Sequence, residues 1–582
     1  MQGWKEKLLS QAGKEVMIKA VVQSIPAYSM GVFKLPVGLC KDIEAMIHKF
    51  WWGSSDSKKI HWVKWSSLCS SKSIGGMGFQ DLQKFNNAML AKQVWRLIHQ
   101  KETLLFKVFS AKYFPNGSVL DALIHPKCSY AWRSILEVRD VINKGAIWRV
   151  GNGELIDIWR HRWLLDLHYS KIISPRANTL VIRVCELFVP HTKIWDPGKL
   201  ALCFLPWEAE IVSQIQVCTD GEEDVLIWPL TADGEYSVRS AYHLLVAVEE
   251  CLAPSSSSLA HNHNVWKQIW EMKVPNKIRH FIWRAAKDSL PTKVNLKARN
   301  VSMDVVCEGC GDYSESTLHS LWLCDQARAV WMSGPEFQFL IRKGCRSFVE
   351  LLEHLFRVGS GLQVAEFATI CWCLWQRRNR VRVSQPSWQI HEIEGQAKRM
   401  VREFWDANEL EQQRSVRRPQ ARWSPPLAGT YKANFDAAIF EELQCVGLGI
   451  VFRDHSGQVI TALSQRIGLS STIVMAEALV ARRAVEFARE LSLFDVILEG
   501  DCLRVVQALN ASGGCNTMYG HVVNETKWLG AVLRHCSYQH VGREGNKLAH
   551  CLVRRAVSSA NTDVWIEDLP EDLDVVFQSD LS

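Results

Sequence analysis

Apolar residues recur at three- and four-residue spacing through much of the first part of the chain, a pattern typical of helices with one buried face. The helices expected from this spacing span residues 8–22, 39–51 and 81–99. The region 111–250 is mixed, with short apolar runs broken by glycine and proline. Helical spacing returns at 265–335 and continues over 336–410. The sequence therefore predicts a helical domain at 1–110, a mixed connecting region and two further helical regions.

Two segments without periodicity separate these regions. Residues 251–264 read CLAPSSSSLAHNHN, a serine-rich stretch typical of a linker. Residues 411–430 contain three prolines and several arginines, which predicts a basic hinge. The arginines of this hinge are Arg414, Arg417, Arg418 and Arg422.

Beyond the hinge the hydrophobic period changes from that of a helix to that of strands. Strand-like runs, a long amphipathic helix, a buried strand and a late strand follow one another, at 431–440, 444–453, 457–466, 472–491, 494–500 and 536–543. This order predicts an α/β domain at 425–560, with a mixed five-stranded sheet and flanking helices. Residues 561–582 are expected to form a C-terminal tail.

Composition narrows the class of protein without deciding its function. A chain of 582 residues is too long for one core, because single cores stop growing near ~250 to 300 residues, so several domains are expected. With 47% apolar and 22% charged residues, the chain is neither collagen-like nor wholly disordered. The richest apolar run, 368–375, is far shorter than the ~18 residues that span a bilayer. The sequence thus predicts an intracellular protein of the nucleus or cytoplasm, without a signal peptide or a membrane partner.

Three acidic residues stand where a chemical site could form. Strand alternation places Asp436 on one face of its strand, and helical spacing places Glu477 on the apolar stripe of its helix. Asp501 follows a buried strand, at the end where open α/β sheets place their sites. If the three carboxylates converge, a hard cation such as Mg²⁺, or Mn²⁺ in its place, would relieve their repulsion. The alternative is that the two aspartates are ordinary strand-end residues and that Glu477 pairs with Arg453 or Arg482.

A second cluster has the spacing of a zinc site. Cys307 and Cys310 are separated by two residues, and His319 and Cys324 follow at short intervals. Four such ligands close the coordination sphere of tetrahedral zinc and predict a structural Zn²⁺. The other cysteines of this chain, which has 18 in all, are expected to be reduced thiols.

The strings KANFDAA, MAEALVARRA, LEGDCLRVVQAL and HVGREGNKLAHCLVRRA occur in that order and together resemble the ribonuclease H domain. The resemblance implies that Asp436, Glu477 and Asp501 are metal ligands and that His540 assists proton transfer or product departure. A fourth aspartate of that family would lie four residues after Asn546, where this chain has His550. Since magnesium prefers oxygen ligands, His550 is expected to weaken the second metal position.

The flanking strings extend the resemblance over nearly the whole chain. The Cys and His cluster and its surroundings are similar to the zinc-binding region of plant non-LTR (LINE-type) retrotransposon reverse transcriptases, and 1–110 resembles a remnant of the polymerase thumb. No two consecutive aspartates occur, so the metal-binding pair of the polymerase palm is absent. The resemblance implies a nucleic-acid-binding endonuclease that cleaves RNA in RNA–DNA hybrids by two-metal hydrolysis. The alternative is a catalytically inactive nucleic-acid-binding remnant.

Overall fold

The computed structural model forms two compact units, one of Met1–Val138 with Leu245–Arg417 and the other of Arg139–Leu244 with Arg418–Ser582. The structure describes residues 9–53, 60–115, 117–164, 170–176, 180–217, 223–252, 263–342, 344–412, 423–469, 472–558 and 561–581. Residues 253–262 and 413–422, which include the serine run and the four hinge arginines, lie outside the described residues. Among the described residues, no helix is long and apolar enough to cross a membrane.

The first unit is helical, as its hydrophobic spacing predicted. Its helices before the second unit are α1 Gln11–Met17, the π-helical η2 Ile18–Val22, α2 Ala27–Met30, α3 Val37–Trp52, α4 Trp65–Cys69, α5 Leu82–His99, α6 Leu104–Tyr113 and α7 Tyr130–Leu136. Those after it are α12 His263–Glu271, α13 Asn276–Ala286, α14 Lys293–Ala298, the π-helical η5 His319–Leu323, α15 Asp325–Trp331, α16 Gln338–Ile341, α17 Phe348–Val358, α18 Gly361–Arg382 and α19 Ile393–Gln412. Asp81 caps α5 by accepting a hydrogen bond from the backbone N–H of Lys84.

One hydrophobic core joins the two halves of this unit. It contains Ile18 and Trp51 from the first half together with Trp283 and Phe367 from the second. The indole N–H of Trp283 donates to the main-chain oxygen of Gly75 at 2.9 Å, which satisfies a buried polar group. Residues between Ile18 and Trp51 and between Leu68 and Phe79 therefore pack with the segment that carries the Cys and His cluster.

The second unit begins with the mixed region. This part contains α8 Arg139–Gly145, β1 Ile147–Arg149, α9 Pro197–Cys203, α10 Pro206–Ser213, β2 Val225–Ile227 and the start of α11 Val238–Leu252. Strands β1 and β2 pair antiparallel, and Ile147 lies opposite Ile227.

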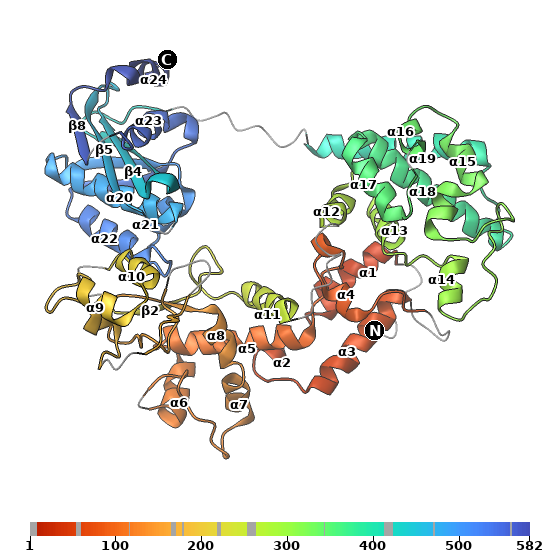
Figure 1. Ribbon diagram of the computed structural model, residues 1–582, viewed down its shortest axis with the longest axis horizontal. Helices are drawn as coiled ribbons and strands as arrows, with labels where there is room; N and C mark the ends of the chain where they lie inside the picture. The colour runs from red at the N-terminus through yellow and green to blue at the C-terminus, as the bar shows by residue number, and fades with distance from the viewer. Residues whose placement is uncertain are drawn as a thin grey trace. The chain divides into compact units, whose positions relative to one another are not determined.

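The rest of the second unit is a six-stranded mixed sheet with helices (Figure 1). Its elements are β3 Tyr431–Phe440, β4 Cys445–Arg453, β5 Val459–Gly468, α20 Ile473–Glu490, β6 Asp495–Gly500, α21 Leu503–Asn510, α22 Gly520–Ala531, β7 His535–His540, α23 Lys547–Arg555, β8 Thr562–Ile566 and α24 Asp574–Leu581. The strand order is β7-β6-β3-β4-β5-β8. Strands β3, β6 and β7 run parallel, whereas the β3–β4, β4–β5 and β5–β8 pairs are antiparallel.

The prediction of a five-stranded sheet was wrong by one strand. Strand β8 pairs with the edge of β5 inside the segment that was expected to be a tail. It is five residues long, and its side chains alternate between exposed and half-buried. Such a short edge strand gains its stability from a neighbour about 100 residues earlier, which its own hydrophobic pattern does not reveal.

Helices cover both faces of the sheet (Figure 1). Helix α20 packs on the face that carries Ala433, Phe435 and Ile450, and α23 packs on the opposite face. Close approach of α23 depends on Gly449, because a Cβ there would lie 2.4 Å from the main-chain oxygen of Ala549. The missing side chain lets the backbone of α23 contact β4 directly.

Candidate metal centres

Asp436, Glu477 and Asp501 meet beside the middle of β3, level with the carboxyl end of β6. One carboxylate oxygen of each residue lies within 4.8 Å of the other two. Asp436 is in β3, Glu477 is in α20, and Asp501 directly follows β6. The parallel register of β3 and β6 sets Phe435 opposite Gly500, which brings the two aspartates side by side. The convergence expected from strand alternation and helical spacing is therefore present.

Burial and neighbouring charges perturb the pKa of both Asp436 and Glu477. Asp436 and Glu477 are each only 5% exposed. Burial, followed by the charges of Asp436 and Asp501, raises the pKa of Glu477 to about 9. Burial also raises the pKa of Asp436, although a hydrogen bond from His550 opposes this shift. At neutral pH the isolated pocket therefore favours a protonated Glu477.

The alternative pairing of Glu477 with an arginine was wrong. Arg453 instead pairs with Asp580 at 3.2 Å, and Arg482 pairs with Glu525 at 2.8 Å. The Oε2 atom of Glu477 is buried and has no hydrogen-bond partner. A buried carboxylate oxygen without a partner, beside two more carboxylates, suits a hard divalent cation such as Mg²⁺ or Mn²⁺. The residues present thus fit the metal that the sequence predicted.

The two predicted histidines lie at the rim of this cluster. Nδ1 of His550, on α23, is 2.7 Å from Oδ2 of Asp436, and the His550 side chain is 52% exposed. Nε2 of His540, at the end of β7, is 3.1 Å from the main-chain oxygen of Asp501. Each histidine therefore contacts one member of the cluster.

Arg543 also lies beside the cluster, although its role was not predicted from the sequence. Its Nε atom lies 3.8 Å from Oδ2 of Asp501, and its side chain is 93% exposed. The residue stands in the string HVGREGNK, three positions after His540, and only this proximity could have drawn attention to it. An exposed guanidinium at the rim of a carboxylate cluster is suited to a phosphate group.

Cys307, Cys310, His319 and Cys324 also gather at one point, with one ligand atom of each within 4.8 Å of the others. The sulfurs of Cys307 and Cys324 are 3.9 Å apart, and the sulfur of Cys310 is 3.4 Å from Nε2 of His319. Tetrahedral zinc with its usual bond lengths would give edges of about 3.8 Å and about 3.5 Å for these two pairs. The geometry therefore fits a closed structural zinc site.

Neighbouring helices hold this cluster in place. The amide of Gln326 donates to the main-chain oxygen of Gly309 at 3.0 Å, and Arg377 on α18 donates to Gln326 at 2.7 Å. Burial raises the pKa of Cys324 to about 12, whereas backbone N–H groups lower the pKa of Cys310. Zinc binds cysteine as the thiolate. A bound Zn²⁺ would therefore supply the positive charge that stabilises the deprotonated form of Cys324.

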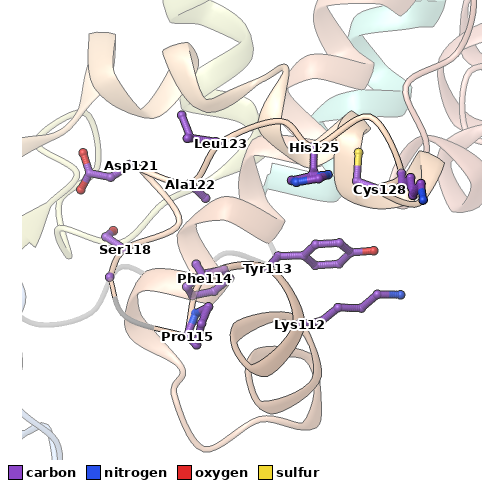
Figure 2. Close-up of a pocket in the computed structure, with 12 residues that line it drawn as sticks. Lys112, Tyr113, Phe114, Pro115, Ser118, Asp121, Ala122, Leu123, His125 and Cys128 are labelled. Atoms are coloured by element: carbon purple, nitrogen blue, oxygen red, sulfur yellow. The ribbon is translucent and has the colours of Figure 1, made fainter.

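The first unit also contains a cavity of about 470 Å³ (Figure 2). Tyr113, Phe114 and Pro115 lie on one side of it, with His125 and Cys128 on a facing loop. The residues that line it include none of the predicted metal ligands. Among the residues that the structure describes, the groups that could hold a metal ion are therefore the two clusters.

Two family models match the chain. Residues 434–556 match a family described as reverse transcriptase-like, and residues 236–331 match one described as zinc-binding in reverse transcriptase. The first match includes the three carboxylates and both histidines, and the second includes all four residues of the Cys and His cluster.

Two curated proteins of Arabidopsis thaliana are similar to the chain. A putative ribonuclease H protein is 28% identical over 597 residues, which covers 96% of this chain and 91% of that protein. An uncharacterized mitochondrial protein is 42% identical over 145 residues, which covers 25% of this chain and 94% of that protein.

Solved structures with similarity to the chain include two ribonucleases H1. The enzyme of the halophilic archaeon Halobacterium salinarum is 24% identical, covers 22% of this chain and 99% of its own, and has a TM-score of 0.21. LC11-RNase H1 in complex with an RNA/DNA hybrid is 20% identical, covers 22% of this chain and 97% of its own, and has a TM-score of 0.20.

Glu477→Gln should stabilise the metal-free protein. Because the folded-state pKa of Glu477 is raised from 4.5 to about 9, wild-type stability should fall as pH rises through this window. Glutamine removes the charge and keeps the shape, so the variant should gain on the order of 2 kcal/mol at pH 8. Thermal unfolding of both proteins in the presence of a chelator, between pH 5 and pH 9, measures this difference in stability.

Glu525→Gln provides the matched control, since it removes a carboxylate that has an arginine partner. This control should lower the melting temperature. With Mg²⁺ added, the wild type should gain stability and Glu477→Gln should gain little. If the melting temperatures of the wild type and Glu477→Gln changed with pH in the same way, this result would contradict the repulsion between the carboxylates.

The double variant Cys307→Ser with Cys310→Ser should lose zinc. Two of four ligands are then replaced by hydroxyls, so bound zinc should fall from about one ion per chain to a small fraction. Elemental analysis of the purified full chain measures the content. Cys345→Ser, a half-buried cysteine of the same unit outside the cluster, should keep its zinc. Stoichiometric zinc in the double variant would disprove the ligand assignment.

Proposed function

The chain belongs to the plant family of retrotransposon-type reverse-transcriptase proteins in which a zinc-binding region precedes a ribonuclease H-like domain, and from this premise we propose that it hydrolyses RNA in RNA–DNA hybrids. In this proposal the second unit carries the nuclease site. The cleavage is endonucleolytic and leaves a 3′-hydroxyl and a 5′-phosphate. The zinc-binding region contributes nucleic-acid contact or architecture.

The observation that carries the proposal is the carboxylate cluster. Asp436, Glu477 and Asp501 come from three separate elements, lie within 4.8 Å of one another, and include a buried oxygen without a partner. A group of buried like charges is unfavourable for folding, which makes a binding role the simplest explanation for it. The name of the Arabidopsis relative that aligns over 96% of the chain supports the same reaction.

Each side chain has a defined task in this proposal. When bound, a pair of divalent cations supplies an activated water and stabilises the leaving oxygen. Asp436, Glu477 and Asp501 would hold these cations. His540, beside Asp501, exchanges a proton during water attack or product departure. Arg543, exposed at the rim, binds a neighbouring phosphate.

His550 stands in the place of a fourth carboxylate. In the metal-free protein it bonds to Asp436 and so occupies one of the oxygens that a cation would use. An imidazole is a poor ligand for magnesium, so the position beside it should bind its cation weakly. Selectivity for RNA would come from contacts to the 2′-hydroxyl group, which DNA lacks.

The full chain should cleave the RNA strand of a labelled RNA–DNA hybrid in the presence of Mg²⁺ or Mn²⁺. Asp436→Asn and Glu477→Gln should each reduce the rate by at least about 100-fold, because each removes a charged ligand from the site. Denaturing electrophoresis of the labelled strand measures the rate. The same RNA as a single strand should not be cleaved.

Arg482→Gln is a suitable control, since Arg482 lies on the same helix as Glu477 but pairs with Glu525. It should retain cleavage. If the wild type binds the hybrid but does not cleave it with either Mg²⁺ or Mn²⁺, the nuclease hypothesis is rejected. The chain would then be an inactive nucleic-acid-binding remnant. Equal cleavage by wild type and Asp436→Asn would point to a contaminating enzyme.

His550→Asp should lower the Mg²⁺ concentration that half-saturates cleavage, by about tenfold. The substitution returns a hard oxygen donor to the fourth position and removes the imidazole from Asp436. A titration of the cleavage rate with Mg²⁺ measures this value. His550→Asn, which removes the imidazole without adding charge, separates the two effects. An unchanged titration for His550→Asp would exclude His550 from the metal position.

A further inference from the structure

We infer that a buried polar network behind the carboxylate cluster positions Asp436 and Asp501, and that Arg453 is its central residue. This inference rests on the proposed function, since it concerns the same site. The network consists of Trp423, Lys432, Asn434, Arg453, Glu499 and Asp580. None of them belongs to the carboxylate cluster.

Arg453 connects three elements that are far apart in the sequence. It is fully buried at the end of β4. Its Nη2 atom donates to Oδ1 of Asn434 at 2.7 Å, and its Nη1 atom donates to Oδ2 of Asp580 on α24 at 3.2 Å. The ring of Trp423 covers the guanidinium at 3.6 Å. Only a planar group with several N–H donors makes all three contacts at once.

A second ion pair completes the network. Nζ of Lys432 lies 3.0 Å from Oε1 of Glu499 and donates to the main-chain oxygen of Ser424 at 2.6 Å. The amide of Asn434 donates to the other oxygen of Glu499 at 3.3 Å. Two cations and two anions, Asp580 included, are thus buried with their charges balanced, as a buried ionic group requires.

The network reaches the cluster through the strand register. Asn434 and Glu499 lie opposite each other on the parallel strands β3 and β6. Asp436 follows Asn434 by two residues on the same face of β3, and Asp501 follows Glu499 by two residues. The bond between Asn434 and Glu499 therefore holds together the part of β3 that carries Asp436 and the end of β6 that precedes Asp501.

The same network also holds the segment that leads to His550. The amide of Asn434 donates to the main-chain oxygen of Gly545 at 3.4 Å. The next residue, Asn546, donates from its own amide to the main-chain oxygen of Phe435 at 3.0 Å. Helix α23 begins directly afterwards and carries His550 beside Asp436. Three segments of the site are thereby bonded to each other through one buried amide.

Burial of these charges is weak evidence for stability, because desolvation offsets most of the attraction between buried ions. Their placement behind the ligands favours a role in geometry. Groups that orient metal ligands typically change metal affinity or activity by about 10- to 100-fold when they are removed. Asn434 and Arg453 are therefore positioning residues, which act through Asp436 and Asp501.

The test compares Asn434→Ala and Arg453→Lys with Arg482→Lys in the full chain. Arg453→Lys keeps the charge but cannot bond Asn434 and Asp580 together. Arg482→Lys is the matched control, because it makes the same change at a partly buried ion pair outside the network. Asp580→Asn, which keeps the shape of the side chain, serves as a second variant if Arg453→Lys does not fold.

Hydrogen exchange of the metal-free proteins is the first readout. Peptides that cover residues 434–437, 499–502 and 542–547 should exchange faster in both network variants and at the wild-type rate in the control. Binding of Mn²⁺, followed by electron paramagnetic resonance, should weaken by about 10- to 100-fold in the network variants only. Cleavage should show a lower kcat at an unchanged KM for the hybrid.

Unchanged exchange and unchanged Mn²⁺ affinity in Asn434→Ala and Arg453→Lys would overturn the inference. Exchange that rises equally across the whole domain would also overturn it, since this marks a general loss of stability. If the wild type does not cleave the hybrid, the proposed function fails, and local exchange in the metal-free proteins still decides the role of the network.

Discussion

The candidate site of the ribonuclease H-like domain is governed by one unfavourable interaction, the repulsion that arises when the clustered Asp436, Glu477 and Asp501 are all charged. Asp436 and Glu477 are nearly buried, and the pKa of Glu477 is raised to about 9 by that burial and by its neighbours. The fold opposes this repulsion with rigid elements on several sides, from the central strands to α20 and α23. In the proposed function, the same unfavourable charge would favour a bound cation, because the cation would remove the cost of the repulsion.

Much of this domain could be predicted from local sequence patterns. The period of two around Asp436 and the helical stripe around Glu477 placed both carboxylates on the correct elements, and the strand-end rule located Asp501. The sixth strand and the contact of Arg453 with Asp580 were missed for a common reason. Each involves partners about 100 or more residues apart, whose pairing depends on the completed sheet and leaves no periodic signal.

In the helical unit, the positions of several helices were predicted from the sequence, but the packing between distant segments was not. Its helices at 37–52 and 82–99 lie close to the expected positions, and the helix expected at 8–22 is divided into α1 and the π-helical η2. From the sequence, residues 1–110 and the zinc-binding region were predicted to be separate domains. In the structure, Trp51 of the first and Trp283 of the second lie in one hydrophobic core. Tryptophan is abundant in this chain, and several of its largest buried side chains are tryptophans that link distant segments.

The contact between α23 and β4 has a consequence for the variation that this helix can accept. Because Gly447 and Gly449 have no side chains, the backbone of α23 lies directly on β4, and the buried Leu548 and Leu552 complete the contact with the sheet. Exposed positions of α23, such as Arg554, are then free to change in charge or size without moving the helix. The exposed side of α23 can therefore change its charge while the imidazole of His550 keeps its distance from Asp436.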